Sequence, residues 1–330
     1  MSSAHDLDLA PVAPAGSLER VPVIDLRDDP AQVVDQVGKA CRDWGFFQAV
    51  GHGVPAVAIA EVQAAARAFF ARPRWEKRRR LRSQDNPWGY YDRELTKERR
   101  DRKEIFDIGP DAGGAGGADG EPFAGSTPWP AEVGNFEPVM KDWFGRMTRL
   151  SGQLAGLISA GLTGDFGALR AAFDPDHSSF LRLNFYPVED PLAGEAGDEA
   201  GLGVHHHTDA GALTVLLQDD VAGLQVFHGG HWHHVEPVPG AFTINIGDMV
   251  QVWSNDAYQA PVHRALAMDR ADRLSVPFFY NPSYAAEVAP LVGEPAYRPI
   301  NWGEFRRRRA DGDFADYGTE VQIGEWRLPA

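Results

Sequence analysis

The sequence predicts an α+β protein whose first half is rich in helices and whose second half is mostly β. Two observations carry this prediction. As far as Leu157, apolar residues recur at helical spacing, whereas from Ser179 onward short strand-like runs alternate with Gly, Pro, Asn and Asp. Several short strands of this kind form a sandwich or a barrel. We see no internal repeat, which argues against solenoid and propeller folds.

Length and composition are those of a protein with a full hydrophobic core. The chain has 330 residues, 43% of them hydrophobic, which suits one large domain or two modest ones. Its 47 acidic and 32 basic residues give a net charge of −15, which repels nucleic acid. The single cysteine, Cys41, excludes an intrachain disulfide, and no apolar run is long enough to cross a membrane. We therefore expect a cytoplasmic protein with no nucleic-acid, membrane or obligate protein partner.

After a short leader, the first half is expected to contain three helices and two strands. Residues 1–19 are small and polar without a secretory signal, and we interpret them as a disordered leader. Asp29-Pro30 is typical of an N-cap and first turn, so a helix should begin there and end at Gly45 with Cys41 in its buried face. The remaining segments are expected as strands at 21–26 and 46–50, and as helices at 56–71 and 139–157.

Beyond these elements, the chain contains one Gly/Ala-rich segment and two basic runs in segments that look helical. Residues 109–120 are rich in Gly and Ala, which favours a flexible loop and suggests a lid over a binding site. The basic runs Lys77–Arg80 and Arg306–Arg309 are not interleaved with aromatic residues, so we interpret them as solvated helix faces rather than nucleic-acid sites.

The second half consists of short strands and tight turns. Gly229-Gly230 indicates a hairpin, and Gly247-Asp248 indicates a further turn. Strands are expected at residues 181–186, 212–217, 224–227, 242–246 and 274–280.

A metal site is indicated by the segment Gly203-Val-His-His-His-Thr-Asp209. Residues two apart on a strand share a face, so His207 and Asp209 can bind one metal ion, and His263 is a credible third ligand. Two histidines and one carboxylate leave open positions, which suits iron(II) oxygenases better than a closed zinc site. Two alternatives stay open: a His205/His207 register, and a cluster of polar histidines without a metal.

A second pair of the same spacing follows His263. Arg273 and Ser275 would lie on one face of a strand, where a guanidinium and a hydroxyl suit a carboxylate ligand. The alternative is an ordinary surface salt bridge of Arg273.

At these residues the sequence resembles the isopenicillin N synthase-like family of iron(II)/2-oxoglutarate oxygenases. His207-Thr-Asp209, His263 and Arg273-Leu-Ser275 stand in the family's order and spacing. The similarity extends to residues 21–25, 40–55 and 297–309. It implies an N-terminal helical/β region at 20–125, followed at 126–330 by the long helix, the catalytic core and a closing helical segment. His206 and Gly51 depart from the family's usual residues, and His52 is interpreted as structural.

The resemblance implies a double-stranded β-helix (jelly roll) core with flanking helices. It assigns residues 182–187 to the first core strand, where Tyr186 and Asn184 would help Arg273 and Ser275 to hold 2-oxoglutarate, and it implies that Phe279 lines the substrate pocket. With Fe(II), 2-oxoglutarate and O2, such an enzyme would hydroxylate, desaturate or cyclise a small organic molecule and release succinate and carbon dioxide. Aromatic residues 88–91 favour a partly apolar substrate. The alternatives are a 2-oxoglutarate-independent iron(II) oxidase of the same family, or a catalytically silent jelly-roll binding protein.

Overall fold

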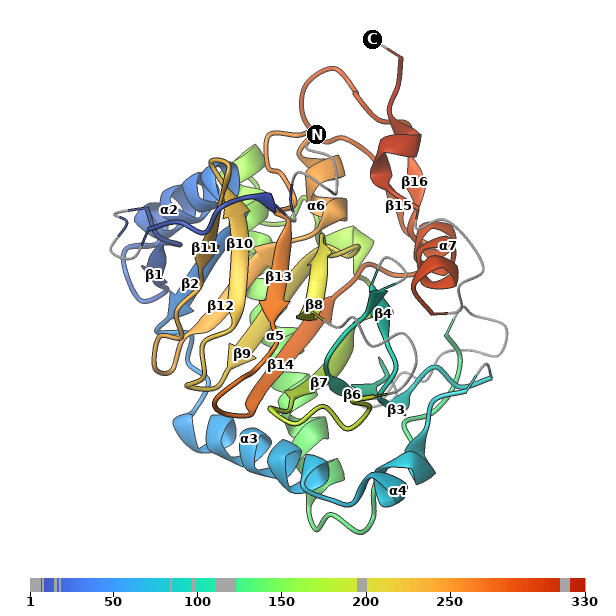
Figure 1. Cartoon of the computed structure of the whole chain (residues 1–330). Coiled ribbons are helices and arrows are strands. Elements are labelled where there is room, and N and C mark those ends of the chain that lie inside the picture. Colours follow the sequence, from blue (N-terminus) through green and yellow to red (C-terminus); the bar gives the residue numbers. More distant parts are fainter. Residues whose placement is uncertain are drawn as a thin grey trace.

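The structure is a computed structural model, which describes residues 7, 9–14, 17, 19–83, 85–96, 99–110, 123–194, 201–314 and 321–329. Two β-sheets face each other at its centre, and helices pack on the outside (Figure 1). This arrangement confirms the predicted α+β class. The larger sheet has eight strands, in the order β1 (Val23–Asp25), β2 (Phe46–Val50), β12 (Phe242–Ile246), β9 (Leu213–Gln218), β14 (Arg273–Tyr280), β7 (Phe180–Tyr186), β6 (Glu104–Ile108) and β3 (Gly89–Tyr91).

The smaller sheet has four strands and carries part of the site. Its order is β11 (His231–His234), β10 (Leu224–His228), β13 (His263–Leu266) and β8 (Leu202–His207). The β10–β11 hairpin turns at Gly229-Gly230, both with positive φ, as the sequence predicts. Two further pairs of short strands are β4 (Leu95–Thr96) with β5 (Arg99–Arg100), and β15 (Glu287–Val288) with β16 (Ile300–Asn301).

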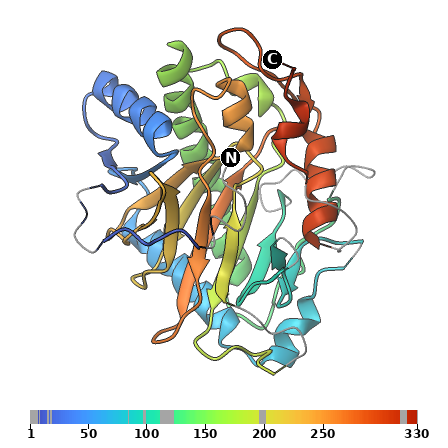
Figure 2. The same cartoon turned by 45° about the horizontal axis from the view of Figure 1, so that its top comes forward.

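The helices cover the outer face of the larger sheet and the ends of the sandwich. They are α2 (Pro30–Asp43), α3 (Ala56–Phe70), α4 (Arg74–Lys77), α5 (Phe136–Thr163), α6 (Asp248–Trp253) and α7 (Trp302–Phe314), with 3-10 turns η1 (Arg78–Arg80), η3 (Arg170–Ala172) and η4 (Ile323–Trp326). The long helix α5 packs against β9 and β14, and α2 lies beside it (Figure 2). Asp29 caps α2 by accepting a hydrogen bond from the Ala31 N–H at 3.0 Å, as predicted. Cys41 is fully buried on this helix.

Several sequence interpretations are wrong because burial depends on partners that are distant along the chain. Lys77 and Arg309 are not solvated: Lys77 forms a buried ion pair with Glu104, and the Arg309 guanidinium donates to the Thr208 carbonyl at 3.2 Å. Asp248 begins the helix α6 and not a tight turn. The sequence does not predict the short strands β3 to β6 between α4 and α5.

The N-terminal segment and the aromatic segment also differ from expectation. Trp232 of β11 donates its indole N–H to the Leu7 carbonyl at 2.9 Å and forms a bridge with Val12, so this part of the predicted leader is packed against the protein. Tyr90 is fully buried in the hydrophobic core, so the aromatic residues 88–91 give no support for an apolar substrate. The expected loop at 109–120 lies almost entirely outside the described residues. Among the described residues, none of the helices is long and apolar enough to span a membrane.

Candidate metal centre and adjoining cavities

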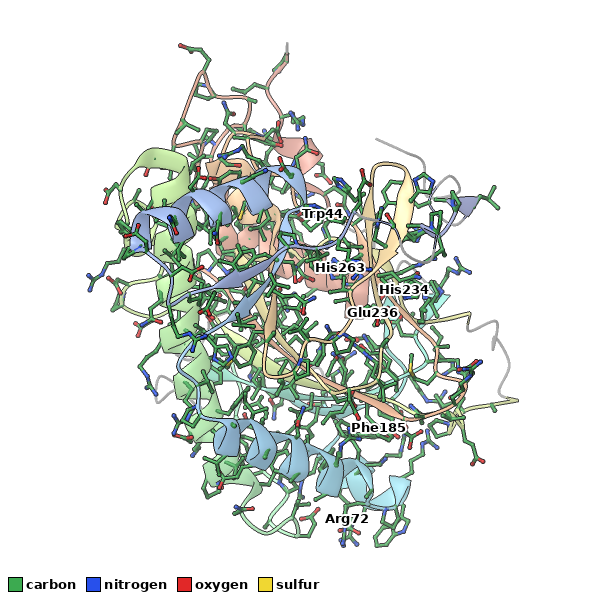
Figure 3. All side chains as sticks on the ribbon, turned by 90° about the vertical axis from the view of Figure 1, so that its left-hand side faces the viewer. Trp44, Arg72, Phe185, His234, Glu236 and His263 are labelled. Carbon is green, nitrogen blue, oxygen red and sulfur yellow. The ribbon has the colours of Figure 1, made fainter. Side chains whose placement is uncertain are left out.

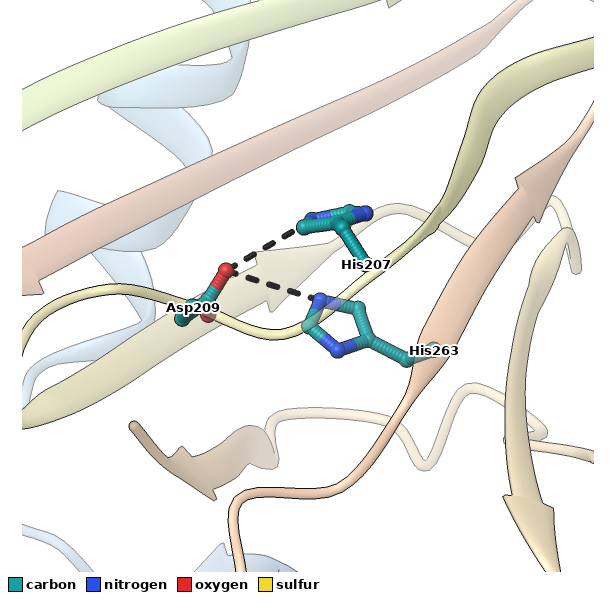
Figure 4. A group of neighbouring side chains, drawn as sticks. All are labelled: His207, Asp209 and His263. Atoms are coloured by element: carbon teal, nitrogen blue, oxygen red, sulfur yellow. Dashed lines mark ion pairs between the residues drawn. The ribbon is translucent and has the colours of Figure 1, made fainter. Parts of the chain in front are cut away.

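Three side chains with metal-binding atoms converge between the two sheets (Figure 4). His207 is the last residue of β8 and His263 is the first of β13, and the antiparallel register places the two directly opposite each other. Asp209 lies two residues beyond His207, past the end of β8, so the predicted strand does not extend to it. Its Oδ1 atom is 3.6 Å from Nε2 of each histidine. Such a group can hold one metal ion.

The two imidazole rings are oriented by backbone carbonyls. The Nδ1 atom of His207 lies 2.8 Å from the His205 carbonyl, and that of His263 lies 3.1 Å from the Pro261 carbonyl. A carbonyl only accepts, so each Nδ1 carries a proton, and in the neutral form of each ring the lone pair lies on Nε2. Both lone pairs therefore face the common centre, as a metal requires.

Asp209 is buried and presents a single oxygen to this centre. Its other oxygen, Oδ2, accepts hydrogen bonds from the Thr214 hydroxyl at 2.5 Å and from the Asn245 amide at 2.7 Å. Thr214 and Asn245 lie opposite each other on β9 and β12. Because both donors engage Oδ2, they leave Oδ1 for the metal.

The charges of the three groups depend on one another. Burial acts against ionisation of Asp209, but the two imidazoles outweigh it and hold the pKa of this carboxyl well below its usual range. Burial and the neighbouring His207 lower the pKa of His263 to about 4. His263 is therefore neutral at physiological pH, which is the form that binds a metal.

The four residues expected to hold a cosubstrate form two cross-strand pairs in the larger sheet. On β14 and β7, Arg273 lies opposite Tyr186, and Ser275 lies opposite Asn184. The Arg273 guanidinium lies over the Tyr186 ring, 4.9 Å from its centroid, and the Asn184 amide donates to the Ser275 hydroxyl at 3.3 Å. Arg273 is only 1% exposed, which excludes the surface salt bridge considered above.

One cavity of about 80 Å³ joins these residues to the metal-binding group. Its wall includes all four residues of the two cross-strand pairs together with His207, Asp209 and His263. Figure 3 shows that His263 lies deep inside the molecule, whereas Arg72 lies at its outer end beyond α3. The structure therefore brings every predicted metal and cosubstrate residue to the wall of one cavity.

A second cavity of about 130 Å³ adjoins the first at His207 and Asp209. Phe279 lines both cavities and stacks on Phe180, with ring centroids 4.6 Å apart. The remaining walls combine apolar and charged side chains, including Leu95, Trp302, Glu94, Lys103, Arg182 and Arg306. The second cavity could thus take a molecule that has both apolar and polar parts.

Sequence reasoning missed the charged groups that line both cavities. Lys103 and Arg182 are bonded to Glu94, at 2.7 Å and 3.0 Å. Burial acts against ionisation of Glu94, but these two cations hold its pKa below the usual range. The alternative His205/His207 register is not supported, because the His205 ring lies 3.1 Å from Asp101 and stays outside the metal-binding group.

Comparisons with protein families match both halves of the chain. Residues 177–282 match the 2OG-Fe(II) oxygenase superfamily, and residues 21–132 match the N-terminal region described as non-haem dioxygenase in morphine synthesis. A homoarginine-6-hydroxylase of Oryza sativa subsp. japonica is 32% identical over 311 residues, covering 86% of this chain and 94% of its own. Gibberellin 2-beta-dioxygenase 4 of Arabidopsis thaliana is 32% identical over 309 residues, covering 87% and 90%.

Solved structures share the fold. JOX2 in complex with 2OG, Fe and JA superposes with a TM-score of 0.77 at 26% identity, covering 100% of this chain and 98% of its own. The rice dioxygenase for auxin oxidation gives a TM-score of 0.70 at 28% identity, covering 94% and 100%. The predicted jelly roll is confirmed by these neighbours.

Proposed function

The chain belongs to the 2OG-Fe(II) oxygenase superfamily and is a 2-oxoglutarate-dependent dioxygenase, and from this premise we propose that His207, Asp209 and His263 hold its iron(II). The single observation that carries this assignment is the convergence of the two Nε2 atoms on Asp209 Oδ1. The donor set fits the ion, because two imidazoles and one carboxylate on one side leave positions open for exchangeable ligands.

The cosubstrate site follows from the shared cavity. We assign Arg273 and Ser275 to the distal carboxylate of 2-oxoglutarate, with Tyr186 beneath the guanidinium and Asn184 fixing the serine hydroxyl. A buried guanidinium without a carboxylate partner in the described part of the chain fits a dicarboxylate, because its charge then meets an anion on binding.

When bound together, iron(II), 2-oxoglutarate and dioxygen supply the oxidation of an unactivated C–H bond, with release of succinate and carbon dioxide. The chain's residues contribute orientation and exclusion of water. The second cavity, with Phe279 at its boundary with the first, would position the small organic substrate so that one C–H bond faces the metal. A relative named as a homoarginine-6-hydroxylase favours hydroxylation over desaturation or cyclisation for this chain.

The two alternatives have less support. The relatives and solved neighbours are named for dioxygenase or hydroxylase activity or contain 2OG, which argues against a 2-oxoglutarate-independent oxidase. A silent binding protein would have no need of the complete and oriented donor set described above. Residence in the cytoplasm stays a prediction.

The test is anaerobic titration of the iron(II) protein with 2-oxoglutarate, followed by the weak visible absorption band of a chelated keto acid. Asp209→Ala should bind no iron and show no band, whereas the exposed Asp220→Ala should match the wild type. Arg273→Ala should bind iron but need far more 2-oxoglutarate, and the exposed Arg270→Ala is its control. Wild-type affinity for both ligands in Asp209→Ala and Arg273→Ala would refute the assignment.

A further inference from the structure

The Arg273 guanidinium is held by neutral groups although it is fully buried. Its Nε donates to the Val221 carbonyl at 3.2 Å, and its Nη2 donates to the Gln218 side-chain oxygen at 3.0 Å. Within the described part of the chain it forms no ion pair. Buried arginines usually have a carboxylate partner, because an uncompensated buried charge is costly.

The orientation of the Gln218 amide is fixed by its two neighbours. Arginine can only donate, so the amide oxygen faces Arg273 and the amide nitrogen faces the Thr243 hydroxyl, 3.0 Å away. Gln218 is the last residue of β9 and does not line the cavity, so it contacts Arg273 on the side away from the cavity.

A carboxylate is available at the next position but is directed elsewhere. Asp219 is buried, and its Oδ2 accepts from Arg67 at 2.7 Å and from the Leu274 N–H at 2.6 Å. Its Oδ1 accepts from the Val221 N–H at 3.1 Å. Both carboxylate oxygens are therefore engaged away from the Arg273 guanidinium, and the neutral amide of Gln218 occupies the place where an acid would neutralise it.

We propose that Gln218 is a positioning and specificity-determining residue, which orients Arg273 while leaving its charge for the distal carboxylate of the cosubstrate. The inference rests on the proposed function of Arg273. A glutamate at this position would pair with Arg273 internally, so a dicarboxylate would have to compete with it. A methionine would remove the acceptor without adding charge, so Arg273 would lose orientation but keep its charge.

The test compares two keto acids that differ only at the far end. 2-Oxoglutarate and 2-oxopentanoate chelate a metal alike, but only the former carries a distal carboxylate. Calorimetric titration of the Mn(II)-loaded protein under anaerobic conditions gives both dissociation constants without turnover. Melting temperature and Mn(II) affinity check that each variant is folded and loaded.

We expect Gln218→Glu to weaken 2-oxoglutarate binding at least about tenfold while 2-oxopentanoate binding changes less than about twofold. Gln218→Met should weaken 2-oxoglutarate by about fivefold, through lost orientation alone. The control is Gln63→Glu, which adds the same charge on α3 beside the Gln218 backbone but not at Arg273. It should leave both constants unchanged.

Two results would overturn the inference while leaving the proposed function intact. One is a wild-type preference for 2-oxoglutarate that persists in Gln218→Glu. The other is an equal loss of both keto acids in Gln218→Glu and Gln218→Met, as a purely structural role would give. A wild-type protein that binds neither acid would instead overturn the cosubstrate assignment itself, and this inference with it.

Discussion

Truncation of Asn245 should weaken iron binding although Asn245 does not reach the metal. Its amide donates to Asp209 Oδ2 at 2.7 Å, and both side chains are buried, at 2% and 8% exposure. Hydrogen bonds to charged groups contribute about 1.5–3 kcal/mol, which corresponds to about 10- to 100-fold in an affinity. The Asp209 carboxylate is charged whether or not the metal is bound, so loss of the Asn245 hydrogen bond destabilises both the metal-free and the metal-bound protein. Only the difference between these two effects weakens iron binding. We therefore expect Asn245→Ala to weaken iron(II) binding by about tenfold.

The assay is anaerobic competition for iron(II) against a chromophoric chelator. Asn301→Ala is a matched control, because it removes an amide that donates to the Glu287 carboxylate at 2.9 Å outside the site. Thr214→Val removes the second donor to Asp209 and should also weaken binding, whereas Thr214→Ser should restore it. The reasoning is refuted if Asn245→Ala and Thr214→Val both bind iron(II) within about twofold of the wild type while folded.

Two further predictions concern groups outside the site. Lys77→Met should lower the free energy of unfolding by about 3–5 kcal/mol, because it leaves the buried Glu104 carboxylate without its cation. Chemical denaturation measures this free energy. A loss no larger than that of Arg79→Met, at an exposed site, would contradict the prediction. Cys41 should not react with a thiol reagent at pH 8 in the native protein, because burial raises the pKa of its thiol to about 12; complete labelling within minutes without denaturant would show that the thiol is accessible.

Sequence reasoning succeeded where chemistry is local. A spacing of two placed Arg273 and Ser275 on one face of β14, and the Asp29-Pro30 pair marked the start of α2. It failed where the role of a residue depends on a partner that is distant along the chain. Lys77 belongs to a basic run that looks solvated, and only the fold brings Glu104 to it. Arg309 belongs to another such run, yet it reaches the backbone between two of the proposed iron ligands.

Asn245 and Gln218 show why the supporting residues could not be assigned from sequence. Asn245 stands out as a polar residue in the apolar strand β12, but the sequence does not say which group it contacts. The strand register determines that contact. Three pairs of neighbouring strands supply the parts of the site: His207 faces His263, Arg273 and Ser275 face Tyr186 and Asn184, and Thr214 faces Asn245. A slip of one residue in any of them would turn its side chains to the opposite face. The geometry of the site is therefore set by pairing within the two sheets, and the residues that hold Asp209 and Arg273 from behind are as much a product of that register as the ligands are.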